Sequence, residues 1–579
     1  MSSRKQSAEA RAIAASEAGA LLTEQTTRAV ESALGQNIVG DFLPSDMFGT
    51  ARDLLLHAAQ QPMALAKATL GFWGDLGNVL TGREKREPEA GDRRFSDKAY
   101  AESPIYSTLL QGYLAWRSAL KNYAEIAELS EKERFLLDQL IEAAAPTNTL
   151  LGNAAALRAA VDSGGVSLAR GAKNLVDDLR KGRPIPSQVD DGAFKVGENL
   201  AVSKGSVVLR TEMFELIQYA AQTETVHERP ILIVPSIVNK FYIFDIAPGR
   251  SIVEHYIKNS QTVFMIAWRN PQKRHDRWGM SNYQDAIDVA VDATRAISGS
   301  QDVNMWAVCG AGPVAVSMAG YYAAKNTRKI NSLLLIVSPL DTKAAAQAPA
   351  LKAFAEPENE TVRSIVRKVT RDKRISANEF TLLFAMLRPN DLIWNYWVSN
   401  YLMGKTPAAF DVLYWNSDGT GMTAQFNYDF SEFAEENPLV TDGAVKVRDT
   451  PIAPLSKLDF DSYVLGAAND HLCIWQSVYR SAQLLGERSQ FVLGNSGHIQ
   501  TIVSPPGNPK ASFFTNETKP ETAEAWLSTA QKHPGSWWDH GVAWTAARAG
   551  AMIPAPKTEG NAEYPPLCAA PGTYVHERG

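Results

Sequence analysis

The sequence predicts an α/β protein with a mostly parallel sheet, preceded by a helical region. Two observations predict it: apolar residues have helical spacing up to about residue 180, and strand-like runs alternate with helical patterns beyond it. Buried strands that alternate with helices are typical of a mostly parallel sheet with helices on both faces. The predicted strands lie within residues 229–238, 261–270, 303–310, 331–341, 460–470 and 488–498.

The N-terminal part is predicted to form a helical domain over residues 1–185. Ser130 is a plausible N-cap for a helix whose apolar pattern ends before Pro146. Residues 181–192 contain two prolines and several turn formers, which are typical of a domain boundary. Residues 186–579 are therefore predicted to form a second domain that carries the sheet.

Two segments interrupt or follow the alternation in the second domain. Between about residues 342 and 455 the alternation of strand-like runs and helical patterns stops. This range contains a helical segment that is rich in aromatic residues. We expect this insertion to be a lid or cap over the C-terminal edge of the sheet. The tail from about residue 550 to 579 is rich in proline and glycine, so we expect it to be extended.

Composition excludes several classes of protein. The net charge is −5, with 58 basic and 63 acidic residues, which argues against a nucleic-acid-binding protein. The three cysteines are too few and too widely spaced for a disulfide framework or a zinc site. We see no signal peptide and no apolar run long enough to span a membrane, so we expect a cytoplasmic protein.

Cys309 lies where a predicted strand meets a predicted helix. The residues two positions before and after it are Ala307 and Ala311. Small residues at these positions are typical of the nucleophile elbow of α/β-hydrolases, in which a strained turn presents the nucleophile. The pattern therefore predicts an α/β-hydrolase core with a lid insertion and a helical N-terminal domain. The alternative is a buried, inert cysteine, which is common in proteins.

The order of candidate groups along the chain favours a catalytic set. An α/β-hydrolase supplies a nucleophile, then an acid, then a histidine, and here Cys309, Asp470 and His498 each follow a predicted strand. The imidazole would take the thiol proton, and the carboxylate would orient the ring and stabilise the imidazolium. Asp302 and Asp341 also lie near predicted strand ends and are the alternative acids.

The other histidines are weaker candidates for the base, and the oxyanion hole is predicted from the backbone. His471 is adjacent to Asp470, and neighbouring residues of an extended segment point in opposite directions. The remaining competitors lie in helical or loop patterns or beyond the last sheet strand. The backbone N–H groups of Gly310 and Val238 are the predicted oxyanion donors. The other competing histidines are His255, His275, His533 and His540.

Several segments together resemble the polyhydroxyalkanoate (PHA) synthases, and most closely the class II, medium-chain-length enzymes. The resemblance covers nearly the whole chain, and "NSGHIQ" with "PPGNPKA" and "RPNDLIWNYW" are its most specific parts; "DRRFSDKAY", "NKFYIFD" and "PGTYVHER" add to it. It implies an acyltransferase that moves (R)-3-hydroxyacyl groups from coenzyme A (CoA) thioesters onto a growing polyester and releases CoA. By position, it places the catalytic cysteine, aspartate and histidine on Cys309, Asp470 and His498.

The resemblance carries further expectations and one departure. It implies a homodimer associated with cytoplasmic polyester granules, and chemistry that needs no metal or redox cofactor. The family's nucleophile box usually reads Gly-x-Cys-x-Gly-Gly, whereas here Ala307 and Ala311 replace two of the glycines. Two alternatives therefore stay open: a thioesterase or depolymerase on the same core, and a weakly active or non-catalytic granule protein.

Overall fold

The computed structural model describes residues 58–578 except 59–60, 82, 90–91 and 349–372, so parts of the predicted N-terminal domain and lid lie outside the described residues. The chain divides into two compact units, 1–85 with 115–128 and 86–114 with 129–579. A boundary near residue 185 stays a prediction.

The described part of the N-terminal region, which begins at residue 58, is mainly helical, as predicted. Ser130 caps α6, and its hydroxyl accepts from the backbone N–H of Glu133, whose carboxylate in turn accepts from the N–H of Ser130. The predicted serine cap is therefore confirmed, and the helix ends before Pro146. The helices of this region are α3 (Pro62–Leu80), α4 (Ala99–Glu102), α5 (Pro104–Ile126), α6 (Glu131–Ala143), α7 (Ala154–Asp162) and α8 (Val166–Arg180).

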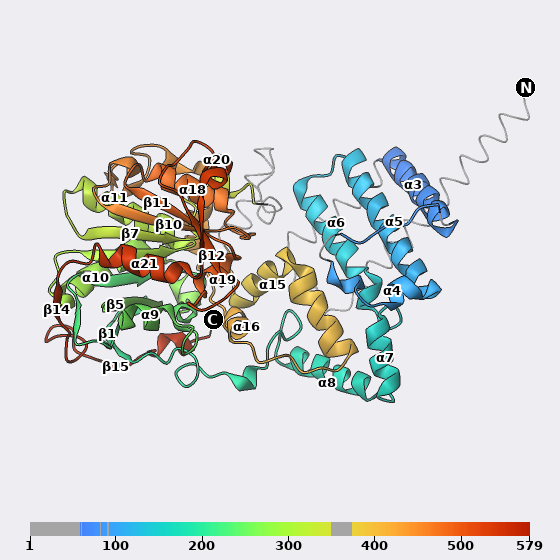
Figure 1. The fold of residues 1–579 in the computed structure, drawn as a ribbon, viewed down its shortest axis with the longest axis horizontal. Coiled ribbons are helices and arrows are strands. Elements are labelled where there is room, and N and C mark those ends of the chain that lie inside the picture. Colours follow the sequence, from blue (N-terminus) through green and yellow to red (C-terminus); the bar gives the residue numbers. More distant parts are fainter. Residues whose placement is uncertain (1–57, 59–60, 82, 90–91, 349–372, 579) are drawn as a thin grey trace, which may run out of the picture. The chain divides into compact units, whose positions relative to one another are not determined.

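The core of the second unit is an 11-stranded sheet with the order β13-β12-β11-β10-β7-β6-β4-β5-β2-β1-β15 (Figure 1). The six central strands, from β11 to β5 in that order, are parallel and correspond to the six predicted apolar runs. They are β4 (Ile231–Val234), β5 (Val263–Trp268), β6 (Val303–Val308), β7 (Ile330–Ile336), β10 (Asp461–Ala467) and β11 (Ser489–Gly494).

Antiparallel strands extend this parallel centre at both ends. One end carries two strands from the region after residue 505, and the other carries two strands before β4 and a short strand from the tail. These edge strands are β1 (Gly205–Arg210), β2 (Phe214–Tyr219), β12 (Ser512–Thr515), β13 (Gln531–Pro534) and β15 (Cys568–Ala569).

Side chains of the parallel strands form one apolar core on each face of the sheet. Along β6, Met305 and Ala307 belong to one core, while Trp306 and Val308 belong to the other. This alternation follows from the two-residue period of a strand, and burial on both faces explains why the runs are continuously apolar. The helices that follow β1, outside the insertion, are α9 (Ile252–Lys258), α10 (Met280–Ser298), α11 (Ala311–Ala324), α18 (Trp475–Leu484), α19 (His498–Ile502), α20 (Ala523–Thr529) and α21 (Trp537–Ala546).

The described part of the insertion is mostly helical and packs on α8. Tyr401 donates its hydroxyl to Asp178 at 2.7 Å, and the indole N–H of Trp397 donates to the carbonyl of Asn148 at 3.0 Å. The elements are α12 (Thr342–Ala345), α15 (Ala377–Leu387), the π-helical η6 (Asn390–Trp394) and η7 (Trp397–Leu402), α16 (Asp411–Ser417), α17 (Ala424–Glu436), and the hairpin β8 (Lys446–Val447) and β9 (Thr450–Pro451).

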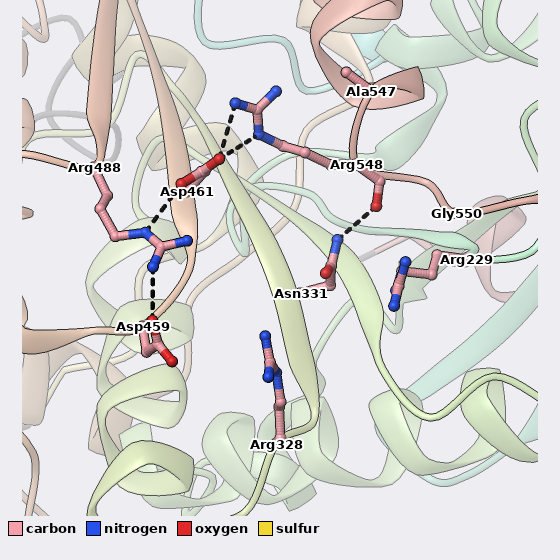
Figure 2. A pocket seen from close by; sticks show the side chains of 9 residues that line it. All are labelled: Arg229, Arg328, Asn331, Asp459, Asp461, Arg488, Ala547, Arg548 and Gly550. Atoms are coloured by element: carbon pink, nitrogen blue, oxygen red, sulfur yellow. Dashed lines mark hydrogen bonds and ion pairs between the residues drawn. The ribbon is translucent and has the colours of Figure 1, made fainter.

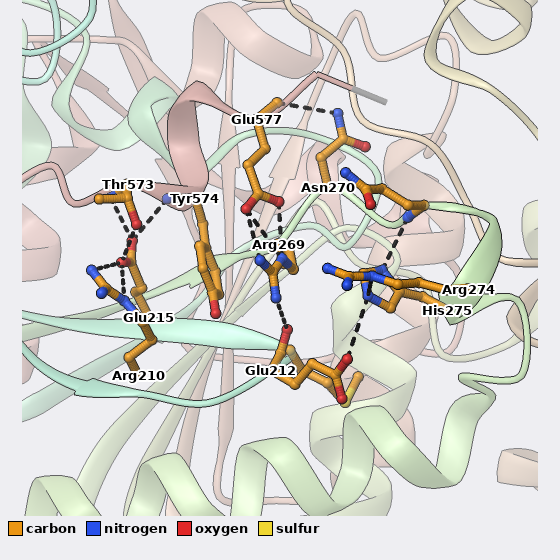
Figure 3. A network of polar contacts seen from close by, with 12 residues as sticks. Arg210, Glu212, Glu215, Arg269, Asn270, Arg274, His275, Thr573, Tyr574 and Glu577 are labelled. Atoms are coloured by element: carbon orange, nitrogen blue, oxygen red, sulfur yellow. Dashed lines mark hydrogen bonds and ion pairs between the residues drawn. The ribbon is translucent and has the colours of Figure 1, made fainter.

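The C-terminal tail is bound to the sheet by buried charge (Figure 3). Glu215 of β2 is fully buried, pairs with Arg210, and accepts from the backbone N–H groups of Thr573 and Tyr574 at 2.8 and 3.0 Å. Arg269 lies 4.2 Å from the centre of the Tyr574 ring. The tail also contains β14 (Met552–Pro554), which pairs with β3 (Thr225–His227), and the 3₁₀ turn η10 (Tyr574–His576). None of the described helices has the length and apolarity needed to cross a bilayer.

Candidate active site

Cys309 occupies a strained turn between β6 and α11. Its φ is +51°, in the left-handed region that residues other than glycine rarely adopt. Three hydrogen bonds hold it there: its N–H donates to Ile336 (2.9 Å), and its carbonyl accepts from the hydroxyl of Ser338 (2.8 Å) and the N–H of Gly312 (3.0 Å). These hydrogen bonds therefore compensate for a backbone strain energy of about 1–3 kcal/mol, as is usual at functional sites.

The alanines beside the nucleophile leave the elbow intact. Ala307 and Ala311 are fully buried in the core, and Cys309 between them keeps the strained conformation of an elbow. The position that requires glycine is Gly312, where an added Cβ would lie 1.7 Å from the Ser338 hydroxyl oxygen. The close approach of helix to sheet therefore depends on the one glycine that the nucleophile box retains.

Gly312→Ala is expected to lower activity about a hundredfold, because a shift of about 1 Å at the nucleophile has an effect of that size. The melting temperature should fall as well, since overpacking costs about 1–3 kcal/mol. Activity and thermal unfolding would be measured together. The double variant Gly312→Ala/Ser338→Gly removes both Ser338 atoms that would clash, so its activity should rise from that of Gly312→Ala towards that of Ser338→Gly alone. A double variant no more active than Gly312→Ala would contradict this reason.

The structure brings Cys309, His498 and Asp470 together at the C-terminal ends of β6, β11 and β10. The Nδ1 atom of His498 lies 2.6 Å from Oδ2 of Asp470, and both side chains are buried. The other carboxylate oxygen, Oδ1, accepts the backbone N–H groups of Leu472 and Cys473, each at 2.9 Å. His498 and Cys309 line the same small cavity, and the imidazole lowers the pKa of the thiol. The structure thus places the predicted thiol beside an imidazole that is hydrogen-bonded to the predicted carboxylate.

The electrostatics of this chain favour a charged thiolate–imidazolium pair. The pKa of Cys309 is held well below its usual 9.0, first by a hydrogen bond with the Cys473 thiol and, against the opposing effect of burial, by His498. Burial lowers the pKa of His498, but the charge and hydrogen bond of Asp470, with a contribution from Cys309, raise it to about 10. The nucleophile is therefore activated before substrate arrives.

The difference in ultraviolet thiolate absorbance between the protein and its Cys309→Ala variant is expected to persist down through neutral pH. Because the pKa of Cys309 is lowered from 9.0, the thiolate is lost only as pH falls through that lower value. Because the pKa of His498 is raised to about 10, the imidazolium charge is present below that pH and lost above it. A signal that first appears near pH 9 would contradict the pair.

The alternative acids have other partners. Asp302 immediately precedes β6, so it lies at the end of that strand opposite to Cys309. It pairs with Arg229 at 2.6 Å. Asp341 caps α12 by accepting the N–H of Ala344 at 3.0 Å.

The competing histidines lie in other environments. His255 contacts Asp539 at 3.1 Å, and His275 stacks on Trp278 with ring centres 4.0 Å apart. His533 and His540 both pack against the ring of Phe513. His471 is half-buried, and burial lowers the pKa of its ring. The carboxylate of Asp470 bonds to His498 instead.

A cavity of about 20 Å³ adjoins Cys309 and His498. It has room for roughly one water molecule. Asn239 and Lys240 contribute to its wall, whereas the predicted oxyanion donors Gly310 and Val238 are not among the lining residues, and their role stays a prediction. The lining residues are Pro235, Ser236, Asn239, Lys240, Ile243, Phe244, Val308, Cys309, Trp415, His498, Ile499 and Ile502.

Trp415 brings the predicted lid insertion to the site. It belongs to α16, and its indole N–H donates to the carbonyl of Lys240 at 2.7 Å. The ammonium of Lys240 donates in turn to Asp418 and to the carbonyl of Val575, both at 2.7 Å. The insertion thus contributes part of the cavity wall and is fastened to the loop that follows β4.

A larger cavity of about 320 Å³ lies near the opposite ends of the parallel strands (Figure 2). Its charges are largely paired: Asp461, the first residue of β10, contacts Arg488 at 3.0 Å and Arg548 at 2.9 Å. Asp470 follows the far end of the same strand. This cavity is therefore separate from the site at Cys309.

The sequence analysis did not predict a role for Cys473. Its sulfur, a carboxylate oxygen of Asp470 and a ring nitrogen of His498 lie within 4.8 Å of one another, so these described residues have the spacing of metal ligands. The short His498–Asp470 hydrogen bond already engages two of the three groups. The signal that could have identified Cys473 is its position three residues after the predicted acid.

Comparisons with known proteins agree with this fold. The family described as "Poly-beta-hydroxybutyrate polymerase (PhaC) N-terminus" matches residues 91–256, and the alpha/beta hydrolase fold family matches residues 229–505. The latter match and the sheet confirm the predicted α/β-hydrolase core.

The chain is 44% identical to poly(3-hydroxyalkanoate) polymerase 1 of Ectopseudomonas oleovorans, over 96% of this chain and 99% of that protein. It is 43% identical to polymerase 2 of the same organism, over 94% and 97% of the two chains. Identity to the polymerase subunit PhaC of Cupriavidus necator is 36%, over 86% and 85%.

Proposed function

This chain belongs to the poly(3-hydroxyalkanoate) polymerase family, and from that premise we propose that it polymerises (R)-3-hydroxyacyl groups from CoA thioesters with Cys309 as nucleophile. The family resemblance predicted from the sequence motifs is confirmed by the identity to the two Ectopseudomonas oleovorans polymerases. The observation that supports the catalytic assignment is the placement of Cys309, in its strained elbow, beside the hydrogen-bonded pair of His498 and Asp470.

In the first half-reaction the Cys309 thiolate attacks the thioester carbonyl, and CoA leaves. The negative charge that develops on the carbonyl oxygen requires N–H donors, and the amide of Gly310 at the start of α11 is the nearest candidate along the chain. The His498 imidazolium returns its proton to the departing sulfur. The acyl chain then rests on Cys309 as a new thioester, and His498 is neutral.

In the second half-reaction the hydroxyl of another 3-hydroxyacyl group attacks the Cys309 thioester. Neutral His498 takes the hydroxyl proton, and Asp470 stabilises the imidazolium that forms. An ester bond replaces a thioester, which is energetically downhill, so these steps need no metal or redox cofactor. The intact strained turn at Cys309 favours this reading over a non-catalytic granule protein.

Substrate entry requires α16 to move, because a cavity of about 20 Å³ cannot hold an acyl chain. Asp418 fastens the end of this helix: its two carboxylate oxygens accept from Lys240 at 2.7 Å and from Tyr242 at 2.9 Å. Arg250 adds an ion pair to Asp411 at 2.5 Å. We propose that these contacts separate when the acyl-CoA binds.

Asp418→Ala is expected to raise the rate at which iodoacetamide labels Cys309 by about tenfold, since a hydrogen bond to a charged group is worth about 1.5–3 kcal/mol. Peptide mass spectrometry would measure the label on Cys309. The control Asp459→Ala removes another ion-paired aspartate, near the opposite edge of the sheet. Equal rates in both variants and the parent would exclude Asp418 as a restraint on access.

The decisive test is CoA release from (R)-3-hydroxydecanoyl-CoA and (R)-3-hydroxybutyryl-CoA, with analysis of the acyl product. We propose that the medium-chain substrate is preferred, on the strength of the resemblance to class II enzymes. Polymer as the product supports a synthase, whereas free hydroxy acid supports the thioesterase alternative. No CoA release with either substrate, from folded protein, would refute the proposal.

We further propose that the active form is a homodimer at the surface of polyester granules in the cytoplasm. The family resemblance supports this proposal. Because α16 must move for substrate to enter, a second subunit or a granule surface could act by displacing this helix. Sedimentation of the protein with and without substrate, and its recovery with granules after density-gradient centrifugation, test the two parts separately.

A further inference from the structure

A second thiol lies close to the nucleophile. The Cys473 sulfur lies within 4.8 Å of a ring nitrogen of His498, and His498 lines the same small cavity as Cys309. Cys473 is also the largest of the influences that lower the pKa of Cys309. Both cysteines are free, Cys309 is partly buried and Cys473 is buried. The catalytic reaction proposed above uses Cys309, His498 and Asp470, and gives Cys473 no step.

The segment that carries Cys473 is suited to small adjustments. Residues 468–474 form irregular turns between β10 and α18, so the Cys473 backbone is outside helix and strand. Its N–H donates to Oδ1 of Asp470 at 2.9 Å, and its side chain is buried in the core. Two thiols beside the same imidazole, one of them on an irregular segment, need only a local backbone adjustment to reach disulfide geometry.

We propose that Cys309 and Cys473 form a reversible intramolecular disulfide when a peroxide reaches the site. The pairing itself follows from the placement of both thiols beside His498, whereas its effect on activity rests on the proposed function. A peroxide is only slightly larger than water, and Cys309 lines a cavity of about 20 Å³ that admits roughly one water molecule.

The chemistry balances without any further reactant. The Cys309 thiolate attacks one peroxide oxygen, the O–O bond breaks, and the leaving hydroxide takes a proton from His498, which gives water and a sulfenic acid on Cys309. The Cys473 sulfur then attacks the Cys309 sulfur and displaces hydroxide, which takes up the thiol proton. Overall, two thiols lose two electrons and two protons, and hydrogen peroxide becomes two waters.

The environment of Cys473 favours the second step once the first has occurred. The hydrogen bond to Cys309 and burial both raise the pKa of Cys473, so it stays protonated beside the charged nucleophile. Oxidation removes the negative charge from Cys309, and His498, neutral after giving up its proton, can accept the Cys473 proton and pass it to the displaced hydroxide. The disulfide would prevent further oxidation of Cys309 to sulfinic acid, which is irreversible.

The test treats the full-length protein with hydrogen peroxide and then with a dithiol reductant. Tryptic peptides analysed without reduction should include a Cys309–Cys473 cross-linked pair, with the mass of the two peptides less two hydrogens. CoA release should fall on oxidation and return on reduction. In Cys473→Ser, the same oxidation should give Cys309 sulfinic acid, and activity should not return. Cys568→Ser, which alters the third cysteine on β15, should behave like the parent.

The outcomes separate this proposal from the proposed function. The cross-link is detected by mass, so it can be found or excluded even if the protein has no polymerase activity. Oxidised, folded parent protein without the Cys309–Cys473 peptide would overturn the proposal. Equal recovery of activity in Cys473→Ser and in the parent would overturn it as well, because protection would not depend on the second thiol. Cys473→Ala repeats the comparison if the serine variant does not fold.

Discussion

Cys309→Ala is expected to reduce CoA release by on the order of 10⁵-fold, because it removes the group that carries the acyl chain. Alanine retains the Cβ of cysteine and can occupy the same strained turn, so the melting temperature should change little. The rate of CoA release under single-turnover conditions measures the loss.

Cys309→Ser is the matched control for this substitution. It keeps a nucleophile of similar size whose pKa is much higher, so an intermediate rate is expected. If Cys309→Ala retained a rate close to that of the parent, Cys309 could not be the nucleophile, and the elbow would be a structural feature only.

Asp470→Asn is expected to lower CoA release by on the order of 10⁴-fold. The amide can donate to Nδ1 of His498, which would leave the proton on the nitrogen that must accept one. It also removes the charge that raises the pKa of His498 to about 10. A smaller share of Cys309 would then be thiolate at neutral pH, which the ultraviolet difference spectrum would show.

The control for this variant is Asp341→Asn, which changes the other candidate acid. Asp341 caps α12 and also accepts from the amide of Asn437 at 2.9 Å, so its loss should affect stability more than rate. If Asp341→Asn lowered activity as much as Asp470→Asn did, without a change in folding, the assignment of the acid would be wrong.

The sequence predicted the centre of the sheet well and its edges poorly. The six parallel strands are buried on both faces, so their apolar runs are long and distinct. The edge strands give weaker signals, as in β13, whose residues 531–534 are mostly exposed and include Gln531 and Lys532. The strand β15 is only Cys568–Ala569, and its pairing with β1 depends on the tail's long return to the sheet.

The same contrast holds at the site. Cys309, Asp470 and His498 could be predicted because each follows a strand of the sheet, and parallel strands bring their C-terminal ends together. Cys473 gave a weaker signal, its position three residues after Asp470, because its approach to the site depends on the turn after Asp470 and not on a strand end. The oxyanion donor Val238 lies in an irregular loop, where no periodic pattern specifies the direction of a backbone N–H group, and its role stays a prediction.

The attachment of the tail has a practical consequence for anyone who labels or immobilises this protein. Lys240 lies in the wall beside the nucleophile, and its ammonium donates to the carbonyl of Val575 in the tail. A bulky label attached to the tail near Val575 would disturb this lysine and, through it, the wall of the site. Labels should therefore be attached away from η10, and kinetic data from tail-labelled protein should be compared with an unlabelled reference.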